Sequence, residues 1–167
     1  MPPSTTEICP DCGALAPPSD LPGHAYLGAS PGCWAVFGDV LAKEFSDARY
    51  FAVHQLTVDA YAAQHPGKRE RRTIQSVGVH LIALYQALEL GYVANHIIRA
   101  RKASVSKRTF VWLDPPPVDE QTMTVVDVAK AQDPGKHCEL ARAWAESVWQ
   151  HWSPHHETIR AWAEALK

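Results

Sequence analysis

The sequence has no long apolar run, and this absence excludes a membrane-spanning helix. At its start it also lacks a basic segment followed by an apolar stretch, the pattern of a secretion signal. We therefore expect a cytoplasmic protein. An excess of charge of one sign is missing as well, because 16 Lys and Arg residues stand against 18 Asp and Glu, for a net charge of -2. Such a chain has no overall attraction for nucleic acid or for an anionic membrane.

The common catalytic signatures are missing too. The sequence contains no G-x-S-x-G nucleophile turn, no phosphate-binding loop and no dinucleotide fingerprint. Basic residues do cluster at 68–72 and 99–108, but no aromatic residues interleave them as base stacking would require. The sequence therefore favours neither covalent catalysis nor nucleic-acid binding, and we interpret both basic stretches as solvated loops.

Cysteine is scarce, with four residues, but the spacing of two of them is informative. A reducing cytoplasm disfavours disulfides, so the C-x2-C pair Cys9 and Cys12, followed by Gly13, predicts a zinc knuckle. The glycine permits the tight turn that aims both thiolates at one point. A closed structural site needs four ligands, and we expect Cys33 as the third. The candidates for the fourth are His24, Cys138 and the histidines of the helical body.

Proline and glycine gather in residues 1–33, which show no helical period and predict an extended arm ordered by metal or by packing. Beyond this arm, apolar residues recur at intervals of three and four, which predicts helices. The expected helices cover residues 34–45, 50–64, 72–90, 125–132 and 136–165; a short helix over 92–101 and a strand over 109–113 lie between them. We therefore predict one mainly α domain over 1–167, with an irregular, cysteine-containing arm (1–33) and a four-helix bundle-like core (34–167).

Local signals set several of the expected helix ends. Pro66 and Gly67 stop the second helix, and Gly91 is suited to cap the third. Thr124 and Asp127 have the spacing of a capping box before the short fourth helix.

The nine histidines are not scattered, and imidazole is a good ligand for zinc. His54 shares one helical stripe with Tyr61 and His65, because eleven residues return to nearly the same angle. His80 falls on the apolar face of the next helix, three residues after Val77. A lone histidine on such a face is usually a core residue, but inward side chains from facing helices are the usual construction of a metal site in a bundle.

Three further histidines crowd the last helical segment, where two geometries are open. If Pro154 only kinks the helix, His151 and His155 form an i, i+4 pair on one face. If the helix breaks at Ser153, His155 and His156 occupy the first turn of a new helix, whose positive end keeps imidazole neutral. His155 points inward in both cases.

We therefore predict a histidine site for zinc or another divalent transition metal such as iron. Its expected ligands come from the inward-facing positions and their neighbours: His54, His80, His155, His156 and His151. The expected catalytic side chains beside it are Asp59, Tyr61 and His65. Asp59 is rotated away from His54, so it is expected to orient a neighbouring side chain. His65 has a second interpretation as a cationic cap of its helix C-terminus.

Four motifs carry a resemblance to known proteins: Cys9-Pro10-x-Cys12-Gly13, His54-x-Leu56-x-Val58-Asp59-x-Tyr61-x-x-Gln64-His65-Pro66-Gly67, His80-Leu81 and Trp152-x-x-His155-His156. In these the chain resembles an uncharacterised bacterial family of unknown function, which implies no established activity. The chain also resembles, more loosely, the DinB-like metal-binding helical bundles, and this resemblance rests on His54, His151 and His155. That likeness implies a three-histidine divalent metal with open positions, as in thiol transferases or hydrolases.

Two functions agree with these features. The first is a metalloenzyme, a hydrolase or transferase, whose metal activates water or a thiol for attack on a small-molecule substrate. The second is a non-catalytic binding or scaffold module with one closed zinc site, its cysteine and histidine ligands coming from both the arm and the bundle. An open coordination position distinguishes the two. The sequence makes no prediction of oligomeric state.

Overall fold

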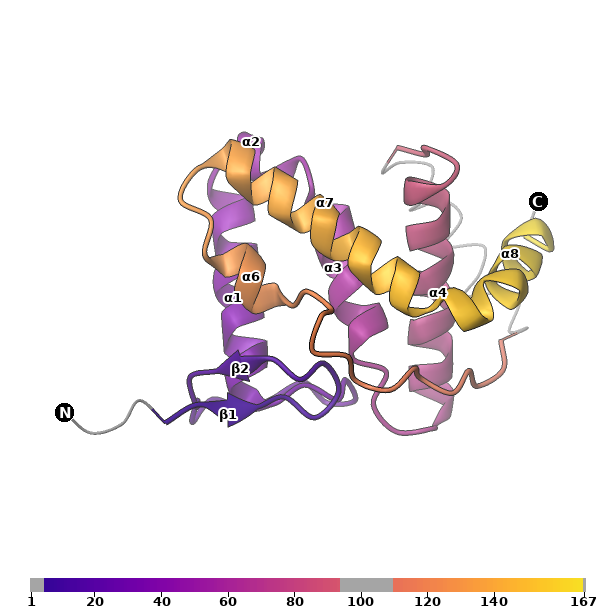
Figure 1. Ribbon diagram of the computed structural model, residues 1–167, viewed down its shortest axis with the longest axis horizontal. Helices are drawn as coiled ribbons and strands as arrows, with labels where there is room; N and C mark the ends of the chain where they lie inside the picture. Colours follow the sequence, from indigo (N-terminus) through magenta and orange to yellow (C-terminus); the bar gives the residue numbers. More distant parts are fainter. Residues whose placement is uncertain (1–4, 94–109, 167) are drawn as a thin grey trace.

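The computed structural model of the chain describes residues 5–93 and 110–166 (Figure 1). These residues are mainly helical, which confirms the predicted fold class. Strands β1 (Glu7–Ile8) and β2 (Leu15–Ala16) form a small antiparallel hairpin in the arm. Within the described residues, the structure contains no helix with the length and apolar character that crossing a membrane requires.

Helix α1 (Pro31–Ser46) begins three residues earlier than predicted. The cause is a local cap, because the Ser30 side chain accepts a hydrogen bond of 3.2 Å from the backbone N of Cys33. Pro31 fits the first helical position, where its missing N–H costs nothing. Cys33 therefore lies in the first turn of a helix and not in the irregular arm.

The helix predicted over 50–64 is two helices, α2 (Ala48–Phe51) and α3 (His54–Gln64). The N-cap Asp47 starts α2 by accepting a hydrogen bond of 2.8 Å from the backbone N of Arg49. Helix α3 ends at His65, its C-cap, just before the predicted stop at Pro66. This places His65 at the bottom of α3, close to the arm.

Helix α4 (Arg71–Leu88) begins at a reciprocal capping box between Glu70 and Thr73. The helix stops at residue 88, two residues before the predicted end, and Gly91 follows with a φ of 67°. The predicted helix over 92–101 and the first residue of the predicted strand lie largely outside the described residues. The rest of that segment, residues 110–113, is irregular chain and forms no strand in the part of the protein that the structure describes, so this prediction is wrong there.

Helix α6 (Val125–Ala129) has the predicted capping box of Thr124 and Asp127. Helix α7 (Pro134–His151) follows, and a 3-10 turn η1 (Ser153–His155) separates it from α8 (His156–Glu164). The last helical segment therefore breaks after Trp152, and the kinked alternative, with His151 and His155 on one continuous helix, is wrong. Proline at the second position of the turn removes the backbone donor that a continuous helix needs.

The helices pack as a bundle-like core around α3, which contacts α4 and α7, and α7 crosses in front of α3 to reach α4 (Figure 1). Helix α1 packs against α2 and α6, and α8 packs against α4. Large side chains at the centre are fully buried, among them Tyr61, Leu81, Trp144 and Ile159. The hairpin lies at one end of α1, next to the loop that follows α3 (Figure 1). The arm and the end of α3 therefore meet at one place.

Candidate metal centre

The first part of the site is the turn that joins β1 to β2. The backbone N of Cys9 donates to the carbonyl of Ala14 at 2.9 Å, and the backbone N of Gly13 donates to the carbonyl of Cys9 at 2.9 Å. Gly13 has a φ of 74°, in the left-handed region that favours glycine. This closed turn holds the Cys9 and Cys12 thiols on one side, and both residues are buried. The predicted knuckle geometry is therefore present.

Cys33 approaches the turn from the start of α1. Its Sγ atom lies 3.9 Å from Sγ of Cys12. The residue before the helix also contributes, because the backbone N of Ser30 donates to Sγ of Cys9 at 3.5 Å. Thiolates are stabilised at helix N-termini by the unpaired backbone donors and the positive helix end. The beginning of α1 is therefore a favourable place for a cysteine ligand.

His65 completes the group from the C-terminal end of α3. It is fully buried, and its Nδ1 atom donates to the carbonyl of Tyr61 at 2.7 Å. This bond selects the tautomer in which Nε2 carries a lone pair, and Nε2 lies 3.5 Å from Sγ of Cys33. The hydroxyl of Tyr61 donates to the same sulfur at 3.5 Å. The imidazole is thus oriented for ligation by its own helix.

The four ligand atoms of Cys9, Cys12, Cys33 and His65 all lie within 4.8 Å of one another. Zn–S bonds of about 2.3 Å in a tetrahedron separate two sulfurs by about 3.8 Å, which is close to the distance between Cys12 and Cys33. Cys33 is the predicted third ligand, and the fourth is one of the histidines of the helical body. We call this group the Cys3His cluster, and it is able to hold a metal ion.

The residues of the cluster have very different pKa values. Hydrogen bonds with Cys12 and Cys33 hold the pKa of the Cys9 thiol far below its ordinary value, while those with Cys33 and Cys9 raise the pKa of Cys12 far above it. Burial alone lowers the pKa of His65, but its hydrogen bonds with Cys33 and Cys9 raise it to about 9. Burial and the charge of Cys33 keep the Tyr61 hydroxyl protonated by raising its pKa. Without a metal, protons therefore stay on Cys12 and on His65. A metal ion would displace these protons, because it binds thiolate and neutral imidazole.

The other predicted ligands do not gather in one place. His54 donates from Nδ1 to Oε2 of Glu44 at 2.7 Å, and His80 from Nδ1 to Oδ1 of Asp59 at 2.6 Å. His155 bonds through Nε2 to the carbonyl of Asp114 at 2.8 Å. Among the described residues, the Cys3His cluster is the one group of at least three potential ligands. The expectation that His54, His80 and His155 hold one ion is therefore not met.

His54 and His155 do not meet because the long helix α7 separates them. Glu44 binds His54 and also accepts a hydrogen bond of 2.9 Å from Nε2 of His137, near the start of α7. His155 follows the far end of the same helix, and a rise of about 1.5 Å per residue makes the stretch of α7 from His137 to His151 about 21 Å long. His54 and His155 therefore belong to opposite ends of the bundle.

The remaining predicted residues have separate roles. His156 stacks on Trp149 with ring centroids 3.7 Å apart and bonds to its carbonyl at 2.8 Å, whereas His151 lines a surface pocket. Asp59 is fully buried and orients His80, as expected for a carboxylate that holds a neighbouring side chain. His65, expected beside a histidine site, belongs to the Cys3His cluster instead, and Tyr61 donates a hydrogen bond to its Cys33 sulfur.

Sequence reasoning missed the network around Glu44. This carboxylate is fully buried and accepts hydrogen bonds from His54, from His137 and, at 2.5 Å, from Thr57. The signal was available, since Glu44 lies four residues after Val40 on the inward face of α1. A carboxylate on an apolar helical face predicts buried donors on the helices packed against it.

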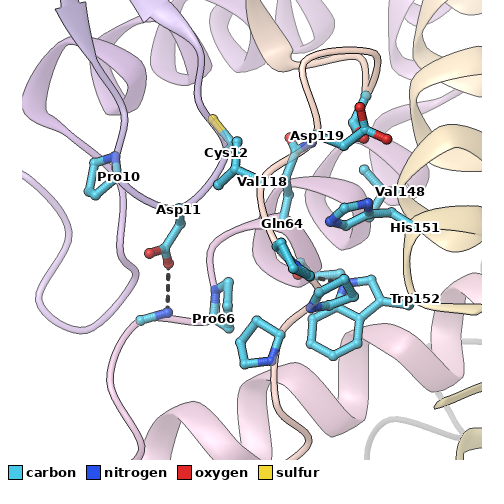
Figure 2. A pocket seen from close by; sticks show the side chains of 16 residues that line it. Pro10, Asp11, Cys12, Gln64, Pro66, Val118, Asp119, Val148, His151 and Trp152 are labelled. Carbon is cyan, nitrogen blue, oxygen red and sulfur yellow. Dashed lines mark hydrogen bonds between the residues drawn. The ribbon is translucent and has the colours of Figure 1, made fainter. Parts of the chain in front are cut away.

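A pocket of about 250 Å³ lies next to the cluster (Figure 2). One wall is the knuckle, with Pro10, Asp11 and Cys12, and another is the loop after α3. The opposite side is formed by residues 115–119 and the end of α7. The backbone N of Gly67 donates to Oδ2 of Asp11 at 2.7 Å, which fastens the knuckle to the loop after α3 (Figure 2).

The fold and the site define a small helical protein with a buried Cys3His cluster that is able to bind a metal. The chain belongs to a family of unknown function (DUF5946), whose match covers residues 7–153. This agrees with the resemblance to an uncharacterised family and supplies no activity. No curated protein and no solved structure matches the chain, so the likeness to DinB-like bundles gains no support.

Proposed function

We propose that the protein is a zinc-stabilised binding module whose ion is structural and not catalytic. The observation that carries this proposal is the ligand set of three thiols and one imidazole, all buried, with their ligand atoms within 4.8 Å. Four protein ligands complete the tetrahedral shell of a structural zinc site. Such a shell leaves no position for the water or substrate that a catalytic zinc binds. The geometry therefore favours the second of the two functions that the sequence suggests.

The donor atoms support zinc as the metal. Thiolate is a soft ligand and imidazole a borderline one, and zinc accepts both in tetrahedral geometry without redox chemistry. The hydrogen bond from Nδ1 of His65 to the Tyr61 carbonyl also matches the support that ligating histidines commonly receive. Hard oxygen-preferring ions such as magnesium or calcium do not fit this donor set.

The ion has a clear structural task in this fold. The hairpin buries only small apolar side chains such as Ala14 and Ala16 and leaves Ile8 69% and Leu15 58% exposed, so apolar burial holds the arm weakly. The Cys3His cluster joins three separate segments: the knuckle, the first turn of α1 and the C-cap of α3. Ligand bonds to one ion would supply the binding energy that hydrophobic packing of the hairpin does not.

The same ion positions one wall of the pocket. Cys12 is a cluster residue and a pocket residue, and Pro10 and Asp11 precede it in the turn. The opposite wall belongs to the helical body. A bound ion would therefore fix the distance between the two walls, which is why we assign binding of a small molecule to this protein and no metal-centred reaction.

Replacement of the metal by Co²⁺ tests the structural role. We expect the intense visible absorption of tetrahedral Co²⁺ together with thiolate charge-transfer bands, and the same spectrum for the control variant His54→Ala. Excess azide should leave the spectrum unchanged, because the cluster offers no open position. A five- or six-coordinate spectrum, or one that azide alters, would contradict a closed structural site.

A further inference from the structure

The pocket beside the Cys3His cluster has mainly apolar walls. Its surface is formed by proline rings and other apolar side chains from four segments: Pro10, Ala63, Pro66, Pro115, Pro116, Pro117, Val118, Val148 and Trp152. Its volume of about 250 Å³ lies just below the range of about 300–1,000 Å³ that is common for drug-sized ligands. The space therefore suits a small, partly apolar molecule.

Trp152 presents an aromatic ring to this pocket in a fixed position. The side chain is 2% exposed, and its Nε1 atom donates to the carbonyl of Ala63 at 3.1 Å. The indole N–H is therefore already used inside the protein. Because the side chain is almost fully buried, the ring contributes a rigid apolar wall to the pocket.

The charged groups of the pocket are acidic. Asp11 and Asp119 line it on opposite sides, Asp11 on the knuckle and Asp119 near His151 (Figure 2), and its lining includes no lysine or arginine. Asp119 accepts a hydrogen bond of 2.9 Å from the backbone N of Gln121, and Asp11 accepts one from Gly67. Among the ion pairs of the described residues, neither carboxylate has a cationic partner.

Asp11 is the less solvated of the two carboxylates. Asp11 is half-buried in the knuckle, whereas Asp119 is exposed. A half-buried carboxylate at the pocket wall attracts a positively charged ligand and repels an anion. The carboxylates thus favour a cation, and the apolar walls favour one carried on an apolar body.

We propose that the pocket binds a small organic cation, an ammonium group carried on an apolar body. The apolar body packs against the prolines and Trp152, and the ammonium group lies within the field of Asp11 and Asp119. The proposal rests on the proposed function in one respect, because Asp11 belongs to the knuckle that the metal holds. It adds the class of ligand, which the cluster alone does not specify.

Three molecules of nearly equal shape test the charge preference: benzylammonium, benzyl alcohol and benzoate. Titration of the zinc-loaded protein, followed by the backbone amide signals of the pocket residues Asp11, Gly67, Val118 and Asp119, gives the three affinities. We expect benzylammonium to bind about tenfold more tightly than benzyl alcohol, corresponding to about 1.4 kcal/mol, and benzoate more weakly than either. Equal affinities, or a preference for benzoate, would overturn the proposal.

Variants that remove one charge each test whether the preference for a cation comes from the carboxylates of the pocket. Asp11→Asn and Asp119→Asn should each reduce the affinity for benzylammonium about threefold to tenfold and leave benzyl alcohol unchanged. Asp20→Asn is the matched control, because it removes the same charge from an exposed residue that is not in the pocket lining. A loss in Asp20→Asn equal to that in the pocket variants would mean that only net charge matters, and would reject the site.

The zinc content of every sample separates this proposal from the proposed function. A zinc-loaded, folded protein without charge preference refutes the cation pocket and leaves the structural zinc site standing. A protein that folds and discriminates the three molecules without any metal refutes the structural zinc site and leaves the cation pocket standing.

Discussion

The Nε2 atom of His65 lies 3.5 Å from Sγ of Cys33, although 32 positions separate them in the sequence. This contact joins the last turn of α3 to the first turn of α1, and the knuckle of the arm closes over both. His65 is fully buried, and its other ring nitrogen is bonded to its own helix. The arrangement holds the imidazole ready for a metal and leaves little freedom for another role.

Substitution of Gly67 should destabilise the protein, because the loop after α3 lies very close to the arm at this residue. Gly67 has a φ of 67°, and a Cβ atom there would lie 2.4 Å from the carbonyl oxygen of Tyr26. Gly91 has the same φ, but nothing lies within 4 Å of its Cβ position. Both alanine variants carry the backbone penalty of about 1 kcal/mol, and we expect Gly67→Ala to lose about 2 kcal/mol more because backbone must move.

Denaturant unfolding of the two variants measures this difference, and metal content shows whether the arm still docks. Gly67→Ala should also bind zinc more weakly, since the shift separates His65 from the knuckle. If both glycine variants were destabilised equally, the loop would not be held against the arm as described.

The carboxylate of Glu44 stabilises the other end of the bundle. It receives three hydrogen bonds in a fully buried position, from Thr57, His54 and His137. Glu44→Gln removes the charge and directs an amide donor at groups that are themselves donors. We expect a loss of about 3 kcal/mol in the free energy of unfolding, with zinc content unchanged.

Asp39→Asn is the matched control for Glu44, because it removes the same charge from an exposed position of the same helix. Its effect should stay within about 0.5 kcal/mol. If Glu44→Gln lost its zinc, the network would be coupled to the metal, and the separation of the two ends of the bundle would be wrong.

Helix α8 is held to the end of α4 by a pH-dependent contact. Glu89 accepts hydrogen bonds from Arg160 and from Nε1 of Trp149, and the bond from Arg160 is the main cause that lowers the pKa of Glu89. A carboxylate with a lowered pKa in the folded state adds stability above its ordinary pKa and loses it as the pH falls. We expect Glu89→Gln to cost about 0.5 kcal/mol at pH 7, a small value because the pair is exposed and screened.

The difference between Glu89→Gln and the unmodified protein should shrink as the pH falls below about 4.3, the ordinary pKa of glutamate. Unfolding curves at several pH values test this. A difference that grew toward low pH would show that the charge of Glu89 does not stabilise the helix.

Local signals predicted much of the fold. Intervals of three and four in the apolar residues placed the long helices, and the spacing of Thr124 and Asp127 placed a capping box that the structure contains. The knuckle was predictable for the same reason, because Cys9 and Cys12 are brought together by one turn. The division at residues 52–53 was missed, since no glycine or proline marks it.

The fourth member of the cluster could not be chosen from the sequence. A helical face gives the direction of His65, but its partner depends on which segment packs there, and that is set by tertiary structure. The same limit explains why the partners of His54 and His80 were not predicted, although the apolar pattern predicted that both side chains point inward. Their partners are the carboxylates of Glu44 and Asp59, which periodicity alone did not identify.

Metal content per chain tests the central claim most directly, measured by elemental analysis of the unmodified protein and of three variants. We predict one zinc per chain in the unmodified protein and in His54→Ala, and loss of that zinc in Cys9→Ser and in His65→Ala. A protein without metal, or a zinc that is lost in His54→Ala and retained in His65→Ala, would contradict the account.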